Sequence, residues 1–245
     1  MMYNEVRKRL LISGCSLTVL FFDMGEVEVM SEMKAGQEDV SSGSPVRKTE
    51  DDPGFPEGEA GEKMLERMNE HHGELRSWGF SNISWRPGME ILDVGCGGGA
   101  AVKDMLRLSE GSIVKGVDYS DTSIELSRKL NAEEIEYERC LIEKADAAKL
   151  PYVDKAFDLV TAIETVYFWK DPAAAFREIR RVIRPGGQFV VLMEACEPAI
   201  EETGFDTPMR IYSEDELLDM MKNAGFASCE SKRGEGENIM VTGTK

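Results

Sequence analysis

Basic residues are scarce in this chain. Lysine and arginine together number 29, against 46 aspartates and glutamates, and the formal net charge is −17. General affinity for nucleic-acid phosphates or for anionic lipid depends on clustered positive charge. We therefore expect neither a nucleic acid nor a membrane surface as a partner.

Cysteine and histidine are also sparse. The five cysteines lie far apart with no C-x-x-C pair, and the two histidines, His71 and His72, are neighbours. The cysteine spacing suits neither a disulfide framework nor a zinc site, and neighbouring side chains on a helix point about 100° apart. We expect no metal site and a reducing, cytoplasmic environment.

The first thirty residues imitate a secretion signal only in part. Arg7-Lys8-Arg9 precede an apolar stretch that ends at Phe22, but no small-residue cleavage site follows it. The stretch is far shorter than the ~20 residues that span a bilayer. A start codon assigned too far upstream, with Met30 or Met33 as the true start, explains the same residues at least as well.

An acidic stretch follows. From Glu26 to Glu62 there are eleven acidic residues against three basic ones, and glycine and proline recur throughout. Such a composition defeats both helical and strand periodicity. We predict that residues 1–60 form a disordered acidic extension and that residues 61–245, roughly 185 residues, form one folded domain.

The rest of the chain is organised around residues 91–101, where an apolar run meets a cluster of glycines and then a helical pattern. This order predicts a buried strand, a tight loop and a helix whose free N–H groups face a ligand. The spacing Gly95-x-Gly97-x-x-Ala100 satisfies the loose dinucleotide pattern. Asp93 precedes the loop, and its carboxylate would repel a pyrophosphate but attract the ammonium group of S-adenosylmethionine.

After this loop, helical and strand patterns alternate, which is typical of a parallel sheet. We predict a doubly wound, mostly parallel seven-stranded sheet with helices on both faces, a Rossmann-like architecture. The expected helices are 62–78, 101–109, 121–130, 171–182 and 213–223, and the expected strands are 91–94, 113–118, a segment within 137–145, 156–163, 189–193, 227–232 and 238–244.

Three positions stand out as functional candidates from the pattern alone. Asp118 ends the second strand 25 residues beyond Asp93, where doubly wound folds place the carboxylate that accepts ribose hydroxyls. His71 and His72 fall on the helix before the first strand. Histidine is the side chain whose ordinary pKa lies nearest neutrality, so either could serve as a base.

The order of the motifs resembles the class I S-adenosylmethionine-dependent methyltransferases, specifically the methyltransferase type 11 group of small-molecule enzymes. The resemblance runs from about Gly88 to the end of the chain and implies S-adenosylmethionine as the cofactor. It rests on the motifs Ile91–Gly99, Gly116–Ser120, Asp146–Pro151, Phe157–Val160 and Ile183–Gly187.

The resemblance also implies which residues hold the cofactor. It assigns the methionine part to Asp93, Gly95, Gly97 and Gly99, and the ribose to Asp118. It assigns the adenine amino group to Asp146 with the backbone of Ala147, and one side of the adenine to Tyr119. Glu164, at the end of the fourth strand, would face the cofactor or the acceptor.

We therefore expect in-line transfer of a methyl group to a small-molecule acceptor, for which positioning supplies most of the acceleration. The candidate bases are Glu164, Tyr167, His71 and His72. Two alternatives remain open: an NAD(P)-dependent oxidoreductase, although no tyrosine has a lysine four residues later, and a protein that binds S-adenosylmethionine without catalysis. Nothing in the pattern indicates an oligomeric state.

Overall fold

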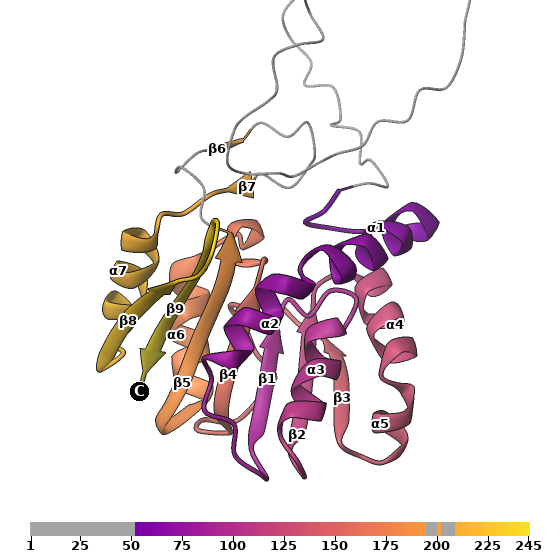
Figure 1. The fold of residues 1–245 in the computed structure, drawn as a ribbon, viewed down its shortest axis with the longest axis horizontal. Coiled ribbons are helices and arrows are strands. Elements are labelled where there is room, and N and C mark those ends of the chain that lie inside the picture. The colour runs from indigo at the N-terminus through magenta and orange to yellow at the C-terminus, as the bar shows by residue number, and fades with distance from the viewer. Residues whose placement is uncertain (1–51, 195–199, 202–208) are drawn as a thin grey trace, which may run out of the picture.

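The computed structural model describes residues 52–194, 200–201 and 209–245 (Figure 1). The signal-like stretch and most of the acidic extension lie outside the described residues. None of the helices in the described ranges is both long and apolar enough to cross a bilayer.

A seven-stranded sheet forms the centre of the molecule, with strand order β3-β2-β1-β4-β5-β9-β8 (Figure 1). The first five of these strands are parallel, whereas β9 is antiparallel to both β5 and β8. This confirms the predicted sheet. The strands are β1 (Glu90–Val94), β2 (Ile113–Asp118), β3 (Cys140–Lys144), β4 (Phe157–Ile163), β5 (Ile183–Glu194), β8 (Ser228–Arg233) and β9 (Asn238–Thr244).

The helices cover both faces of the sheet. Adjacent side chains of a strand point to opposite faces of the sheet, and in β1 both faces are apolar. Ile91 belongs to one apolar cluster and Leu92 to the other, and both side chains are fully buried. A strand buried on both faces reads as a continuous apolar run. The helices are α1 (Gly58–His71), α2 (Gly73–Ser81), α3 (Ala100–Leu108), α4 (Asp121–Leu130), α5 (Ala132–Glu136), α6 (Pro172–Val182) and α7 (Glu214–Ala224).

The two clusters divide the helices between the faces. Side chains of α2, α3 and α4 pack on the Ile91 side, and those of α6 and α7 pack on the Leu92 side. A short 3-10 turn, η1 (Val166–Phe168), follows β4, and a two-stranded ladder of β6 (Ile200–Glu201) and β7 (Met209–Arg210) lies apart from the main sheet.

Local capping explains where several helices begin. Ser213 and Glu216 form the predicted capping box of α7, and Gly225 ends that helix with φ of 91°. The Asp171 side chain accepts from the N–H of Ala174 at the start of α6, and Pro172 occupies its first turn. These signals were sufficient to predict both helix starts.

The N-terminal part of the domain differs from the prediction in two ways. The expected helix 62–78 is split at His72, next to Gly73, since glycine weakens a helix interior. Residues 52–60 belong to the domain rather than to the extension, so the predicted boundary at residue 60 is wrong. Pro56 accepts a hydrogen bond from Ser120 Oγ at 2.6 Å, and residues 58–60 begin α1.

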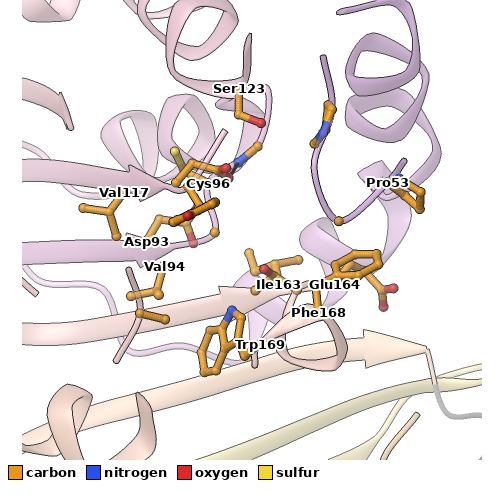
Figure 2. Close-up of a pocket in the computed structure, with 18 of the residues that line it drawn as sticks. Pro53, Asp93, Val94, Cys96, Val117, Ser123, Ile163, Glu164, Phe168 and Trp169 are labelled. Carbon is orange, nitrogen blue, oxygen red and sulfur yellow. Dashed lines mark hydrogen bonds between the residues drawn. The ribbon is translucent and has the colours of Figure 1, made fainter. Parts of the chain in front are cut away.

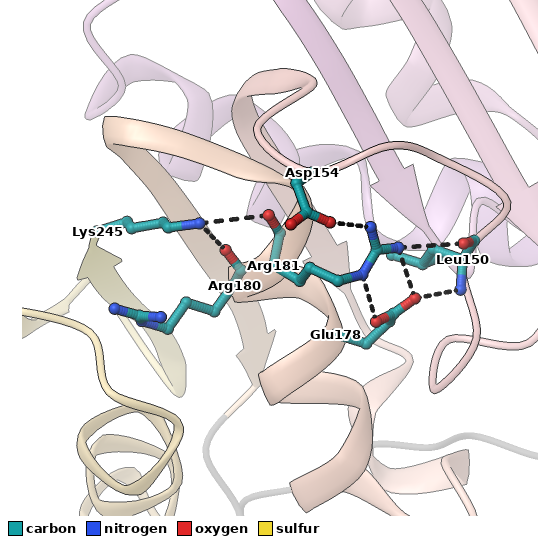
Figure 3. A network of polar contacts seen from close by, with 6 residues as sticks. All are labelled: Leu150, Asp154, Glu178, Arg180, Arg181 and Lys245. Carbon is teal, nitrogen blue, oxygen red and sulfur yellow. Dashed lines mark hydrogen bonds and ion pairs between the residues drawn. The ribbon is translucent and has the colours of Figure 1, made fainter.

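A polar network braces the segment after β3 against α6 (Figure 3). The Arg181 guanidinium donates to both oxygens of Glu178 at 2.8 Å and to Asp154 at 2.7 Å, and Glu178 in turn accepts the N–H of Leu150 at 2.9 Å. Close by, Lys245 Nζ donates to the carbonyl of Arg180 at 2.6 Å, near the C-terminal end of α6, where a positive charge is favourable.

We expect Arg181→Met to lower the free energy of unfolding by about 1–3 kcal/mol, because half-buried Glu178 loses its bidentate partner. Urea denaturation measures the change. The matched control is Lys222→Met, which removes an exposed pair with Asp219 and should cost below about 0.5 kcal/mol. Equal effects of the two substitutions would show that the network does not stabilise the domain.

Candidate functional site

A cavity of about 570 Å³ opens at the carboxyl ends of the parallel strands, which is the size of a small-molecule site. Its wall combines the ends of β1, β2 and β4 with α1, α2 and residues 52–57, which we call the N-terminal strap. Figure 2 shows Asp93 and Cys96 toward one end of the cavity and Pro53 and Phe168 toward the other. This is the crevice where open α/β sheets bind ligands.

The glycine loop has the conformation that glycine permits and other residues resist. Gly95, Gly97 and Gly99 have φ of 79°, 49° and 83°. The N–H groups of Gly95 and Cys96 both donate to the carbonyl of Val117, at 2.8 and 3.0 Å, which fixes the loop to the end of β2.

The individual glycines serve different purposes. A Cβ at Gly97 would meet only Leu65, at 3.6 Å, so this position leaves room for a ligand to approach the backbone. A Cβ at Gly99 would lie 2.7 Å from Asn131 Nδ2, and Gly99 is not among the residues that line the cavity. Gly99 therefore precedes α3 and lets it pack closely on α4, and its assignment to the methionine part stays a prediction.

Asp118 ties this loop to the next strand. Its carboxylate accepts the N–H of Gly97 at 2.9 Å and the N–H of Ser120 at 3.0 Å. Burial raises the pKa of Asp118, and these backbone donors oppose that rise. Asp118 also lines the cavity, within reach of a ligand bound there.

Asp93 lies beneath the loop and is almost fully buried. Its Oδ1 accepts a hydrogen bond from Thr161 Oγ1 at 2.6 Å. Burial raises the pKa of Asp93 to about 7, although Thr161 and the charge of Arg76 act in the opposite direction. The carboxyl group therefore changes charge near neutral pH and lines the cavity where a cationic ligand group would stabilise its ionised form.

The residues assigned to adenine lie at one rim of the cavity. Tyr119 is 60% exposed, and its ring centre is 5.5 Å from that of Phe55 in the N-terminal strap. Asp146 and Ala147 also line the cavity, and Asp146 Oδ1 accepts the N–H of Ala148 at 2.8 Å. Two aromatic rings and a fixed carboxylate at one rim suit a flat, amino-bearing ring.

The structure separates the four candidate bases. Glu164 and His72 line the cavity, whereas exposed His71 and partly buried Tyr167 do not. Glu164 uses both carboxylate oxygens within the protein, because Oε2 accepts from Tyr167 at 2.7 Å and Oε1 accepts the N–H of Glu194 at 2.6 Å. The cavity lining therefore gives no support to the prediction of His71 or Tyr167 as a base.

Glu164 has the geometry of a brace between β4 and β5. Its φ of 51° is unusual for a residue other than glycine. Burial raises the pKa of Glu164 to about 7, and burial also raises the pKa of Tyr167. Together with Tyr167 it fixes η1, whose Phe168 lines the cavity beside Trp169.

His72 is the remaining candidate base. Burial lowers its pKa to about 4, with smaller contributions from His71 and Arg76, so the imidazole is neutral at physiological pH. Among the residues that the structure describes, none forms a hydrogen bond with this imidazole. Its nitrogens are therefore available to a ligand.

Several cavity residues escaped the sequence analysis. The N-terminal strap was assigned to the acidic extension, although Asp52 to Glu57 all line the cavity. Asn69 and Arg76 were also missed. With Leu65 and His72 they recur at helical spacing and line the cavity, so this spacing is the signal that could have found them.

The fold and this loop define a Rossmann-like α/β protein with a ligand-sized cavity at the carboxyl ends of its parallel strands. Residues 92–191 match the family model described as a methyltransferase domain. The chain is also similar to a solved S-adenosylmethionine-dependent methyltransferase of Thermotoga maritima, at 22% identity and a TM-score of 0.58, over 75% of this chain and 97% of that one.

Curated relatives with similar sequences are also named as methyltransferases. Cycloartenol-C-24-methyltransferase 1 of Oryza sativa subsp. japonica is 34% identical over 179 residues, which are 68% of this chain and 50% of the relative. Methyltransferase GfsG of Streptomyces halstedii is 35% identical over 137 residues, or 56% and 45%. The chain spans about half the length of these relatives. The chain therefore carries a methyltransferase domain over residues 92–191, and the cofactor of such domains is S-adenosylmethionine.

The pKa of Asp93 leads to a prediction. We expect the affinity for S-adenosylmethionine to rise roughly tenfold between pH 6 and pH 7.5, because the cationic ligand favours ionised Asp93 and below its pKa of about 7 the carboxyl is protonated. His72 titrates below this window. Calorimetry at several pH values measures the change, and Asp93→Asn should flatten it. An equally steep profile in that variant would assign the dependence to another group, such as Glu164, which lines the cavity and whose pKa burial also raises to about 7.

Proposed function

We propose that this protein transfers the methyl group of S-adenosylmethionine to a small-molecule acceptor. The observation that carries this proposal is the open space at Gly97, next to an Asp118 carboxylate that already holds the Gly97 N–H at 2.9 Å. A ligand can reach the loop backbone and the carboxylate together only at such a position. The proposal therefore rests on the geometry of Gly97 and Asp118 in this chain.

The cavity has room for an acceptor beside the cofactor. Leu65, Met68, Phe168 and Trp169 give part of the wall an apolar and aromatic character. An apolar wall with few polar groups suits a small organic acceptor. The rice relative is named for cycloartenol and supports an acceptor of this general kind.

In this mechanism the protein acts mainly by positioning. The glycine loop, Asp93 and Asp118 would hold the cofactor, which would supply an activated methyl group, and the apolar wall would orient the acceptor. An acceptor hydroxyl or amine must also lose a proton. Neutral His72 is the group placed to take it, and its low pKa makes it a weak base, so orientation remains the larger contribution.

The test is release of S-adenosylhomocysteine by the purified protein with a panel of sterols, hydroxylated aromatics and amines. We expect turnover with at least one apolar acceptor, and a lower rate in His72→Gln for an acceptor that loses a proton. The matched control is His71→Gln, because His71 is exposed outside the cavity. Binding of S-adenosylmethionine without turnover of any acceptor would favour a non-catalytic binding protein. Stabilisation by NAD alone would contradict the proposal.

A further inference from the structure

Phe168 lines an end of the cavity that the cofactor assignments do not use. It belongs to η1, and Figure 2 shows it with Pro53 at the end opposite from Asp93 and Cys96. The glycine loop begins at the Asp93 end, so an acceptor bound beside the cofactor would contact the Phe168 end. A phenyl ring offers such an acceptor an apolar surface with two rotatable side-chain bonds behind it.

Tyr167 supports Phe168 from outside the cavity. The two ring centres lie 4.5 Å apart, with the ring planes at 72°, and the Tyr167 ring also packs against the apolar core. The Tyr167 hydroxyl donates to Glu164 Oε2 at 2.7 Å. Burial raises the pKa of Tyr167, so the hydroxyl keeps its proton at physiological pH. The ring behind Phe168 is therefore fixed at its far end by a hydrogen bond to a carboxyl group.

Glu164 is itself held in place, so it can fix Tyr167. Its Oε1 accepts the N–H of Glu194 at the end of β5 at 2.6 Å, and its φ of 51° is a conformation that only well-determined surroundings maintain. The next residue, Thr165, packs on the glycine loop, because a Cβ at Gly95 would collide with the Thr165 side chain. The segment that carries Phe168 is thus anchored to both the sheet and the glycine loop.

We propose that Tyr167 is a positioning residue for the acceptor, and that it acts by holding Phe168 against the apolar part of the acceptor through its hydrogen bond to Glu164. This inference rests on the proposed function and extends it to a residue outside the cavity. Methyl transfer requires the acceptor atom in line with the methyl group, and a displacement of about 1 Å can cost roughly a hundredfold in rate. A Phe168 ring free to shift would allow such displacements.

The test is a double-mutant cycle on the panel acceptor that the parent protein methylates fastest. Tyr167→Phe keeps the ring and removes only the hydroxyl, and it should lower kcat/KM for that acceptor about tenfold. Calorimetry with S-adenosylhomocysteine should show a cofactor affinity within about twofold of the parent. In a Phe168→Ala background, Tyr167→Phe should have little further effect on kcat/KM, because residues that act through one another are not additive.

A second tyrosine provides the matched control. The Tyr152 hydroxyl donates to Glu143 Oε2 at 3.0 Å, and neither of these two residues lines the cavity. Tyr152→Phe therefore removes the same kind of hydrogen bond from the same domain. It should leave both kcat/KM for the acceptor and the affinity for S-adenosylhomocysteine unchanged.

Three outcomes would overturn the inference while the proposed function stands. An unchanged kcat/KM in Tyr167→Phe would show that the hydroxyl positions nothing. A tenfold loss that recurs in the Phe168→Ala background would show that Tyr167 does not act through Phe168. A matching loss of affinity for S-adenosylhomocysteine would show that Tyr167 supports the whole cavity rather than the acceptor. Failure of the parent protein to methylate any panel member would instead contradict the proposed function, and this inference with it.

Discussion

Gly97→Val is expected to abolish measurable binding of S-adenosylmethionine while the protein keeps a cooperative thermal transition. Gly97 has φ of 49°, a conformation that a β-branched residue resists, and the added side chain would enter the space through which the ligand reaches the backbone. The sheet should survive, because its stability comes from buried strands such as β4 and β5 rather than from the loop. Calorimetry measures binding, and thermal denaturation with far-ultraviolet circular dichroism measures the fold.

A matched control separates backbone strain from loss of the site. Gly111, between α3 and β2, has φ of 67° with no atom within 4 Å of an added Cβ, and it does not line the cavity. Gly111→Val should lower the melting temperature through the same kind of strain and bind S-adenosylmethionine normally. Parental affinity in Gly97→Val would show that the loop does not hold the cofactor.

Asp118→Ala should have the second-largest effect, a loss of at least about a hundredfold in affinity for S-adenosylmethionine. The substitution releases the N–H groups of Gly97 and Ser120 and also removes the expected acceptor of the ribose hydroxyls. Hydrogen bonds to a charged group contribute roughly 1.5–3 kcal/mol each, of which water recovers part. Titration calorimetry measures the dissociation constant.

Two further variants sharpen this result. Asp118→Asn keeps one carbonyl oxygen as an acceptor and should fall between the parent and Asp118→Ala. Asp121→Ala removes a carboxylate three residues away that is exposed and pairs with Lys144, so it should bind the cofactor almost normally. Similar losses in Asp118→Ala and Asp121→Ala would mean that net charge, rather than the hydrogen bonds of Asp118, controls the affinity.

The sheet was predictable because its signals are local. A strand buried on both faces is a short apolar run, and the glycine loop after β1 combines several positive-φ positions with a following helix. Capping residues such as Ser120 and Asp171 accept hydrogen bonds from nearby N–H groups, so they mark helix starts within a few residues of sequence. Local patterns singled out Asp93, Asp118 and the glycine loop, whereas Tyr119, Asp146 and Ala147 came only from the family resemblance; all of them except Gly99 line the cavity.

The features that the sequence analysis did not predict depend on contacts between residues far apart in sequence. The N-terminal strap is acidic and rich in proline and glycine, and its order comes from tertiary contacts, such as the 2.6 Å bond from Ser120 to Pro56 across 64 residues of chain. The hydrogen bond from the N–H of Glu194 to Glu164 also joins residues far apart in sequence, 30 positions from each other. Composition therefore predicted disorder for residues 52–60, and chain position gave no sign that Glu164 also joins β4 to β5.

The place of β9 in the sheet constrains the order in which the domain can be made. Among the described strands β9 comes last in the sequence, yet it lies between β5 and β8 and pairs with both. During synthesis, β5 therefore keeps one edge unpaired, and β8 has no partner, until residues 238–244 leave the ribosome. An exposed apolar strand edge is prone to wrong pairing. A slow or interrupted end to translation should thus yield aggregating chains even though the whole cofactor site has already been synthesised.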